Sequence, residues 1–195
     1  MFTGIVETIG EIVGLERSAD HVDLMIRSSI SADLSPDQSV CHDGVCLTVV
    51  AVSQNTHTVQ LVTETLERSH FRTAGIGDQV NLERSVPASG RFEGHFVQGH
   101  VDCTGQLIAT DHEIWTFRYP LKYARLLVEK GSICVNGVSL TVVRVKGDTF
   151  SVAVIPYTLS KTNFNRLSPG APVNLEFDII AKHILRQYDL HERPQ

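Results

Sequence analysis

The sequence SVCHDGVCLTVV at residues 39–50 returns 93 positions later as SICVNGVSLTVV at residues 132–143. The register then continues without a gap, and 19 of the 45 residues at positions 39–83 are identical to their counterparts. Similarity at a fixed internal offset is typical of a duplicated structural unit. We therefore predict that the chain consists of two similar domains.

The start of each half aligns with an offset of 95, which places Gly4 on Gly99 and Val6 on Val101. The change from 95 to 93 indicates that a loop of the second half is two residues shorter. The stretch that joins the halves is rich in glycine, proline and serine, as linkers are. The predicted units are an N-terminal domain at residues 1–88, a linker at 89–94 and a C-terminal domain at 95–182.

Short apolar patterns of period two within each half predict β-strands. The pairs Asp43-Gly44 and Asn136-Gly137 lie between runs of β-branched residues, which is typical of a tight hairpin with positive φ at both central residues. About six such strands per half predict a small closed antiparallel barrel, because closure removes exposed strand edges. The predicted fold class is all-β, with two tandem barrels.

Helical patterns are sparse in this sequence. Residues 120–130 predict one helix, with residues 29–34 as its counterpart in the first half. Residues 179–190 predict a C-terminal helix, because their apolar side chains recur at near-helical spacing. An amphipathic helix that follows two complete domains needs a covering surface. We expect self-association to provide it, and packing on the chain's own barrel is the alternative.

The composition excludes several classes of protein. The chain of 195 residues carries a net charge of -5, and no run of lysine or arginine follows the pattern of a nucleic-acid binder. No apolar run approaches the roughly 18 residues of a membrane helix, and the first residues lack the regions of a signal peptide. We therefore expect a soluble cytoplasmic protein that binds neither nucleic acid nor membrane.

The cysteines and histidines do not form a metal-binding pattern. Four cysteines are present without a CxxC pair, so we expect reduced thiols and no zinc site. His95 and His100 are the only close histidines, and in a strand a separation of five positions would place them on opposite faces. The sequence therefore predicts no metal.

The repeated motif places small polar groups on one face of a strand. Cys46 shares a face with Thr48, while Leu47 points to the other face, and Ser139, Leu140 and Thr141 repeat the pattern. Each residue alone is compatible with an ordinary strand position. Because both halves keep the polar pair in the same register, we predict two related binding sites for one kind of ligand.

The start MFTGIVE at residues 1–7, the doubled motif GV(C/S)LTV and the stretch GHFVQGHVD at residues 94–102 together resemble the riboflavin synthase α-chain family. The resemblance implies two six-stranded Greek-key barrels, no cofactor, and a homotrimer formed through the C-terminal helix. The implied substrate is 6,7-dimethyl-8-ribityllumazine. Two molecules of it give riboflavin and 5-amino-6-ribitylaminouracil by transfer of a four-carbon unit. Association with lumazine synthase, which makes this substrate, is left open by the sequence.

The resemblance also assigns roles to individual residues. Cys46 is a candidate nucleophile or proton acceptor and His100 a candidate for proton transfer, with Ser139 and Thr48 assisting. Lys130 is expected to hold a ribityl hydroxyl or a ring oxygen. Asp178 is expected either to orient a neighbour's group or to be a plain solvated or capping aspartate.

The implied substrate contacts come from three parts of the chain. Gly4, Ile5 and Val6 match a segment that reaches the ligand of a neighbouring chain, where an N-terminal barrel faces a C-terminal one. The expected N-barrel pocket comprises Cys46, Leu47, Thr48, Gln60, Leu61, Val62, Thr63, Glu64 and Thr65. The expected C-barrel pocket comprises Gly99, His100, Val101, Ser139, Leu140, Thr141, Ala153, Val154, Ile155, Pro156, Tyr157 and Thr158, with the two stretches Gln60–Thr65 and Ala153–Thr158 as strands.

Two functions other than catalysis are alternative interpretations of the sequence. A fluorescent lumazine-binding antenna protein shares the fold implied by the resemblance, but such proteins lack the cysteine and histidine of the enzymes. This chain has both Cys46 and His100. A structural adaptor is not expected to keep two polar pockets. The sequence therefore favours the enzyme.

Overall fold

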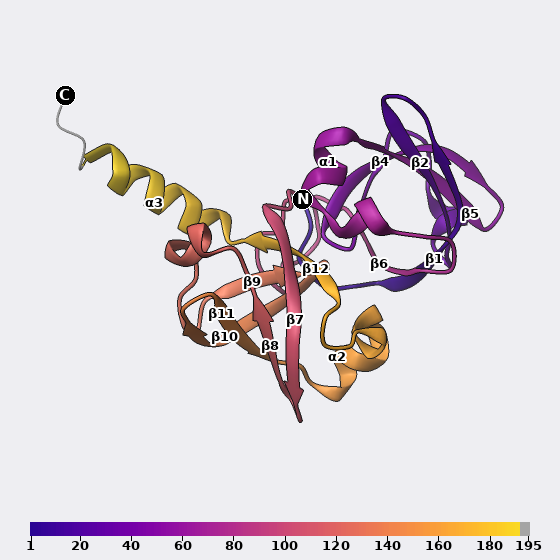
Figure 1. Ribbon diagram of the computed structural model, residues 1–195. Coiled ribbons are helices and arrows are strands. Elements are labelled where there is room, and N and C mark those ends of the chain that lie inside the picture. The colour runs from indigo at the N-terminus through magenta and orange to yellow at the C-terminus, as the bar shows by residue number, and fades with distance from the viewer. Residues whose placement is uncertain (192–195) are drawn as a thin grey trace.

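The computed structural model describes residues 1–191 and contains two closed antiparallel barrels of six strands each (Figure 1). The first barrel comprises β1 (Thr8–Arg17), β2 (His21–Arg27), β3 (Ser39–His42), β4 (Val45–Ser53), β5 (Thr56–Val62) and β6 (Gln79–Arg84). The second comprises β7 (Cys103–Asp111), β8 (Ile114–Arg118), β9 (Ser132–Val135), β10 (Val138–Lys146), β11 (Thr149–Ala153) and β12 (Pro172–Phe177). Both barrels have one strand order, β1-β2-β5-β4-β3-β6 and its counterpart β7-β8-β11-β10-β9-β12, which confirms the all-β prediction.

The barrel interiors follow the period-two pattern of the sequence. In β5, Val59 and Leu61 are buried, while Thr58 and Gln60 point away from the core. Each core also buries a repeat-related phenylalanine from outside the strands, Phe71 in the first barrel and Phe164 in the second. Apolar burial on this scale is the main stabilising contribution in a small barrel.

The hairpin turns have the predicted geometry. Asp43 and Gly44 have φ of 44° and 83°, and Asn136 has φ of 45° in the equivalent turn. Positive φ at both central residues matches the twist of the flanking strands. The two missing residues of the second half fall in the turn between β7 and β8, because the offset is 95 from β1 to β7 and 93 from β2 to β8.

The short helices differ from the sequence prediction. Residues 120–130 form only a 3-10 helix, Leu121–Leu126, and residues 29–34 contain the 3-10 helix Ser31–Asp33. The predicted strand stretches end early, at Val62 and Ala153, and are followed by α1 (Thr63–Arg68) and α2 (Pro156–Lys161). Each of these short helices reverses the chain direction between two strands of a barrel. A longer helix or strand would carry the chain past the next strand.

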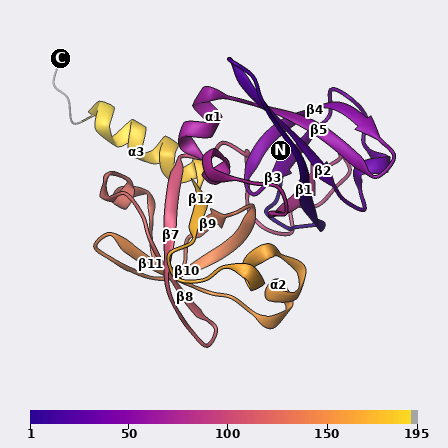
Figure 2. The same ribbon diagram turned by 45° about the vertical axis from the view of Figure 1, so that its right-hand side comes forward.

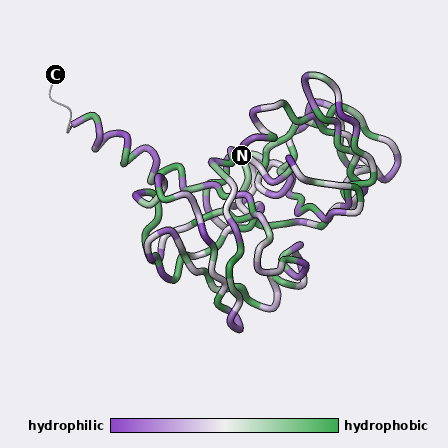
Figure 3. Tube along the Cα trace, viewed as in Figure 1, coloured by the Kyte–Doolittle hydropathy of each residue, from purple (hydrophilic) through white to green (hydrophobic). Residues whose placement is uncertain are grey.

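The C-terminal helix α3 (Ile179–His191) extends away from both barrels (Figures 1 and 2). Its exposed side includes Ile180 and Ile184, whose side chains are 54% and 65% exposed, and polar segments alternate with apolar ones along it (Figure 3). Arg125 holds the helix to the second barrel through Asp189 at 2.9 Å. Within residues 1–191, no helix is long and apolar enough to cross a membrane.

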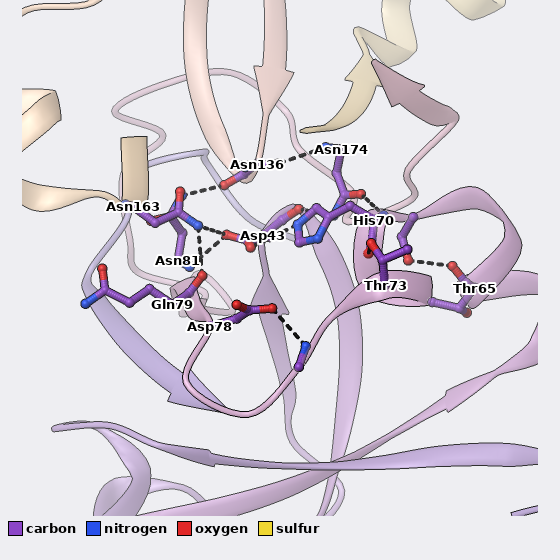
Figure 4. Close-up of polar contacts among 12 residues, drawn as sticks. Asp43, Thr65, His70, Thr73, Asp78, Gln79, Asn81, Asn136, Asn163 and Asn174 are labelled. Carbon is purple, nitrogen blue, oxygen red and sulfur yellow. Dashed lines mark hydrogen bonds and ion pairs between the residues drawn. The ribbon is translucent and has the colours of Figure 1, made fainter. Parts of the chain in front are cut away.

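A buried polar network joins the two barrels where their hairpin turns meet (Figure 4). Asp43 Oδ1 accepts hydrogen bonds from the Asn81 backbone at 2.8 Å and from the Asn163 side chain at 2.9 Å. The Asn81 side chain donates to Asn136 O, and the repeat-related Asn174 donates to Asp43 O, each at 2.8 Å. Because each asparagine crosses to the other barrel's turn, the network fixes the relative orientation of the barrels.

Candidate functional site

The segments that precede each barrel are exchanged between the two halves. We call residues 1–7 the first arm and residues 96–102 the second arm. The Ser139 N–H of the second barrel donates to Gly4 O of the first arm at 2.8 Å, and the Cys46 N–H of the first barrel donates to Gly99 O of the second arm at 2.8 Å. Each barrel is therefore completed by the arm of the other half.

Two glycines allow this close approach. Gly4 and Gly99 have φ of 78° and 80°, a conformation that favours glycine. A Cβ atom at Gly99 would lie 2.5 Å from Cys46 Cβ, and one at Gly4 would lie 2.6 Å from Ser139 Cβ. The repeated glycines thus place each arm directly against the repeated Cys or Ser position.

The second arm and the first barrel line an open pocket of about 390 Å³, which we call the first pocket. The first arm and the second barrel line a smaller open pocket of about 110 Å³, the second pocket. The first pocket is lined by Val45, Cys46, Glu64, Thr65, Arg68, Ser69, Gln98, Gly99, His100, Val101, Asp102 and Lys182. The second pocket is lined by Gly4, Ile5, Val6, Val138, Ser139, Tyr157, Thr158, Lys161 and Thr162.

The two pockets are equivalent by the internal repeat. Every residue of the second pocket has its repeat counterpart in the first, so that Ser139 corresponds to Cys46, Ile5 to His100 and Tyr157 to Glu64. The pockets keep one geometry but differ in chemistry. At two of the equivalent positions, the first pocket presents the thiol of Cys46 and the imidazole of His100, whereas the second presents the hydroxyl of Ser139 and the apolar side chain of Ile5.

The first pocket also contains balanced charges. Lys182, in the first turn of α3, lies with its Nζ 2.6 Å from Asp102 Oδ2, and Arg68 forms an ion pair with Glu64. Asp102 Oδ2 also accepts the Phe177 N–H at 2.9 Å. The α3 helix therefore contributes directly to the wall of the first pocket.

Ser139 of the second pocket pairs with a histidine that does not itself line the pocket, a contact that the sequence did not indicate. His95 Nδ1 lies 2.7 Å from Ser139 Oγ. Burial lowers the pKa of His95, an effect that the charge of Asp178 partly offsets, so the ring favours its neutral form. The argument that His95 and His100 would lie on opposite faces holds for a strand, but residues 94–102 are irregular apart from one bridge, so it does not apply.

The structure divides the predicted substrate contacts into two groups. Those that line a pocket are Gly4, Ile5, Val6, Cys46, Glu64, Thr65, Gly99, His100, Val101, Ser139, Tyr157 and Thr158. Those that line neither of the two pockets are Leu47, Thr48, Gln60, Leu61, Val62, Thr63, Lys130, Leu140, Thr141, Ala153, Val154, Ile155 and Pro156. Leu47 and Leu140 point into the barrel cores, whereas Thr48 and Thr141 are exposed, as the alternation predicts.

The pairing of arms and barrels differs from the sequence expectation. Gly99, His100 and Val101 were expected in the C-barrel pocket, but they line the pocket of the N-terminal barrel. Gly4–Val6 cover the second barrel of the same chain. Asp178 caps α3, since its Oδ1 accepts the Ile180 N–H at 2.9 Å, which fits the capping alternative. In residues 1–191 no three His, Cys, Asp or Glu side chains gather in a way that could hold a metal ion.

Comparisons with known proteins agree with this double-barrel site. A family profile, the lumazine binding domain, matches residues 3–85 and 98–178. Riboflavin synthase of Mycobacterium bovis is 43% identical over 195 residues, covering 95% of this chain and 97% of that protein. Riboflavin synthase of Bacillus subtilis is 39% identical over 191 residues, covering 95% and 89%.

A solved structure shares the fold. LumP in complex with riboflavin superposes with a TM-score of 0.83 at 24% identity, covering 91% of this chain and 99% of that one. The profile matches twice and covers most of the residues of both halves. The chain therefore belongs to the lumazine-binding family and resembles the riboflavin synthases over nearly its whole length.

Proposed function

We propose that this protein is a riboflavin synthase, which converts two molecules of 6,7-dimethyl-8-ribityllumazine into one riboflavin and one 5-amino-6-ribitylaminouracil. A four-carbon unit leaves one molecule and joins the other, so the two reactants are the same compound. The observation that carries the proposal is the pair of pockets related residue by residue by the repeat. Two similar pockets suit a compound that reacts with itself, and positioning two reactants can supply about 7–11 kcal/mol.

The chemical difference between the pockets suits different tasks for the two substrates. Cys46 and His100 in the first pocket supply a nucleophile or proton acceptor and a group for proton transfer. At the second pocket, Ser139 Oγ lies within hydrogen-bond distance of His95 Nδ1, and a neutral ring that accepts the serine proton through this nitrogen would make the serine oxygen a nucleophile or a proton relay. Thr48 assists from the exposed face of β4.

The two reacting rings meet, in this proposal, between subunits of a homotrimer, with the first pocket of one subunit facing the second pocket of its neighbour. Exposed apolar side chains on α3 and at Tyr157 beside the second pocket support such an interface. Residues outside the two cavities, such as Lys130, would contact substrate only across it. The cytoplasmic location, the domain bounds and an association with lumazine synthase stay predictions.

A lumazine-binding protein without catalysis is the second candidate. LumP binds the lumazine and riboflavin in its crystal structures, and its likeness to this chain at 21% and 24% identity concerns the fold. The retained Cys46 and His100 favour the enzyme.

The test is incubation of the purified chain with 6,7-dimethyl-8-ribityllumazine while riboflavin absorbance is followed. We expect one riboflavin per two lumazines consumed. C46S and H100Q should lower the rate by about 100-fold, which is typical of lost proton transfer. C103S is the control, since Cys103 lies outside both pockets. Binding without turnover would favour the carrier, whereas unchanged rates in C46S and H100Q would leave the reaction intact and refute their roles.

A further inference from the structure

A buried glutamate lies beneath each arm, at the same position of the repeat. Glu83 ends the sequence VNLE in β6, and Glu176 ends the identical sequence in β12. Their residues are only 5% and 2% exposed. Neither carboxylate forms an ion pair with a Lys, Arg or His side chain within residues 1–191, so their partners must lie elsewhere.

The partners of Glu176 are backbone N–H groups of the second arm. Oε1 accepts the Gln98 N–H at 2.7 Å, and Oε2 accepts those of Gly99 and His100 at 2.9 Å each. Three consecutive residues of the arm are therefore held by one side chain. This contact holds Gly99 against Cys46 and fixes the position of the His100 backbone, from which the imidazole side chain extends.

Glu83 holds the first arm in the same way. Its Oε1 accepts the Thr3 N–H at 2.6 Å and the Thr3 hydroxyl at 2.8 Å, and its Oε2 accepts the Gly4 N–H at 2.9 Å. Gly4 then lies against Ser139 in the other barrel. The contact between a glutamate and the arm of its own half thus occurs in both halves, although only the second arm carries a histidine, His100.

A carboxylate suits this task because it accepts hydrogen bonds at both oxygens and donates none. Burial is costly for a carboxylate and raises the pKa of both glutamates, while the N–H donors of the arms, and for Glu176 also the charge of Lys182, act in the opposite direction. An apolar residue at either position would leave the converging N–H groups of an arm unpaired. Packing of the barrel core alone does not require a buried carboxylate at this position.

We infer that Glu176 and Glu83 are positioning residues whose effects are crossed: Glu176 of the second barrel shapes the first pocket, and Glu83 of the first barrel shapes the second pocket. The inference rests on the proposed function for the identity of the ligand. It follows from the arm exchange, because each glutamate holds the arm of its own half while that arm covers the other barrel. The two barrels therefore control each other's substrate contacts.

The test compares E83Q and E176Q by hydrogen–deuterium exchange, with and without riboflavin. Glutamine keeps the size, but its amide nitrogen must face at least one N–H of the arm in either orientation. We expect E176Q to expose the amides of residues 98–100 and to weaken riboflavin protection of α1 by on the order of 10-fold in concentration, with α2 unaffected. E83Q should expose the amides of Thr3 and Gly4 and weaken protection of α2 instead. E129Q, an exposed glutamate outside both pockets, is the matched control.

The crossed pattern separates positioning from a general loss of structure. Equal losses at both pockets in each variant, or a loss at the pocket of the glutamate's own barrel, would overturn the inference. If E176Q fails to fold, G99A displaces the same arm through its contact with Cys46, and it must affect α1 alone. A crossed pattern without any turnover by the unaltered chain would refute the proposed reaction only, whereas turnover with an uncrossed pattern would refute this inference only.

Discussion

Acid should destabilise the first barrel more than the second, because only the first contains a histidine pair in its core. His42 and His57 are each 1% exposed, and their Nε2 atoms lie 2.9 Å apart. The repeat places Val135 and Phe150 at these positions in the second barrel. The two cores therefore offer an internal comparison.

The direction of each hydrogen bond in this pair can be deduced. Val40 O can only accept, so His42 Nδ1 donates to it at 3.0 Å and His42 Nε2 is the acceptor. His57 Nε2 then donates to His42, and the Ser31 hydroxyl donates to His57 Nδ1 at 2.8 Å. Both rings are neutral in this chain of bonds. A proton added to either ring would turn an acceptor into a donor and break the chain.

The magnitude follows from the pKa values. Burial lowers the pKa of His42 from 6.5 to about 3, with the neighbouring His57 adding to the effect, and lowers that of His57 from 6.5 to about 4. Because the folded pKa lies below the unfolded one, this stability is fully present above pH 6.5 and is lost as the pH falls toward 4. At 1.36 kcal/mol per unit of pKa, His57 alone accounts for about 2 kcal/mol by pH 5, and His42 acts in the same direction.

The assay is urea unfolding at pH 7.5 and pH 5.0, with the variant S31A/H42V/H57F as the comparison. The variant carries the second barrel's residues, since Ala124 is the counterpart of Ser31. Hydrogen exchange reports each barrel separately, and fluorescence of Trp115 in β8, the only tryptophan of the sequence, follows the second barrel. We expect the unaltered first barrel to lose more free energy of unfolding at pH 5.0 than the variant. Equal losses in the two proteins would refute the assignment of acid sensitivity to this pair.

Two further predictions concern α3. K182Q should weaken riboflavin binding at the first pocket several-fold in a fluorescence titration, because it removes the charge that balances Asp102. R125Q is the control: it removes the ion pair with Asp189 that holds α3, but it lies outside the pocket and should leave binding unchanged. Equal effects of the two variants would show that Lys182 acts only by docking the helix. I184E should lower the mass in solution measured by light scattering, since a charge at this exposed apolar position opposes burial between subunits; an unchanged mass would place the interface elsewhere.

Much of the architecture could be predicted from local patterns. The offset of 93 predicted two equivalent units, period-two alternation predicted their strands, and Asp43-Gly44 with its counterpart predicted the hairpins. The hairpins depend on the types of adjacent residues, and the faces of a strand depend on its period of two residues. Both can be determined from the order of residues along the chain. The 3-10 helices were predicted less well, because the length of a turn across a barrel end depends on the barrel below it.

The assignment of each arm to a barrel, by contrast, came only from the tertiary structure. The repeat shows that Gly4 and Gly99 are equivalent, but it is compatible with each arm covering either barrel. The hydrogen bonds Cys46 to Gly99 and Ser139 to Gly4 decide the matter, and they join residues far apart in the chain. The arms have no periodic pattern, so the pairing of His95 with Ser139 and the crossed glutamates follow from how the two barrels dock, which no local pattern encodes.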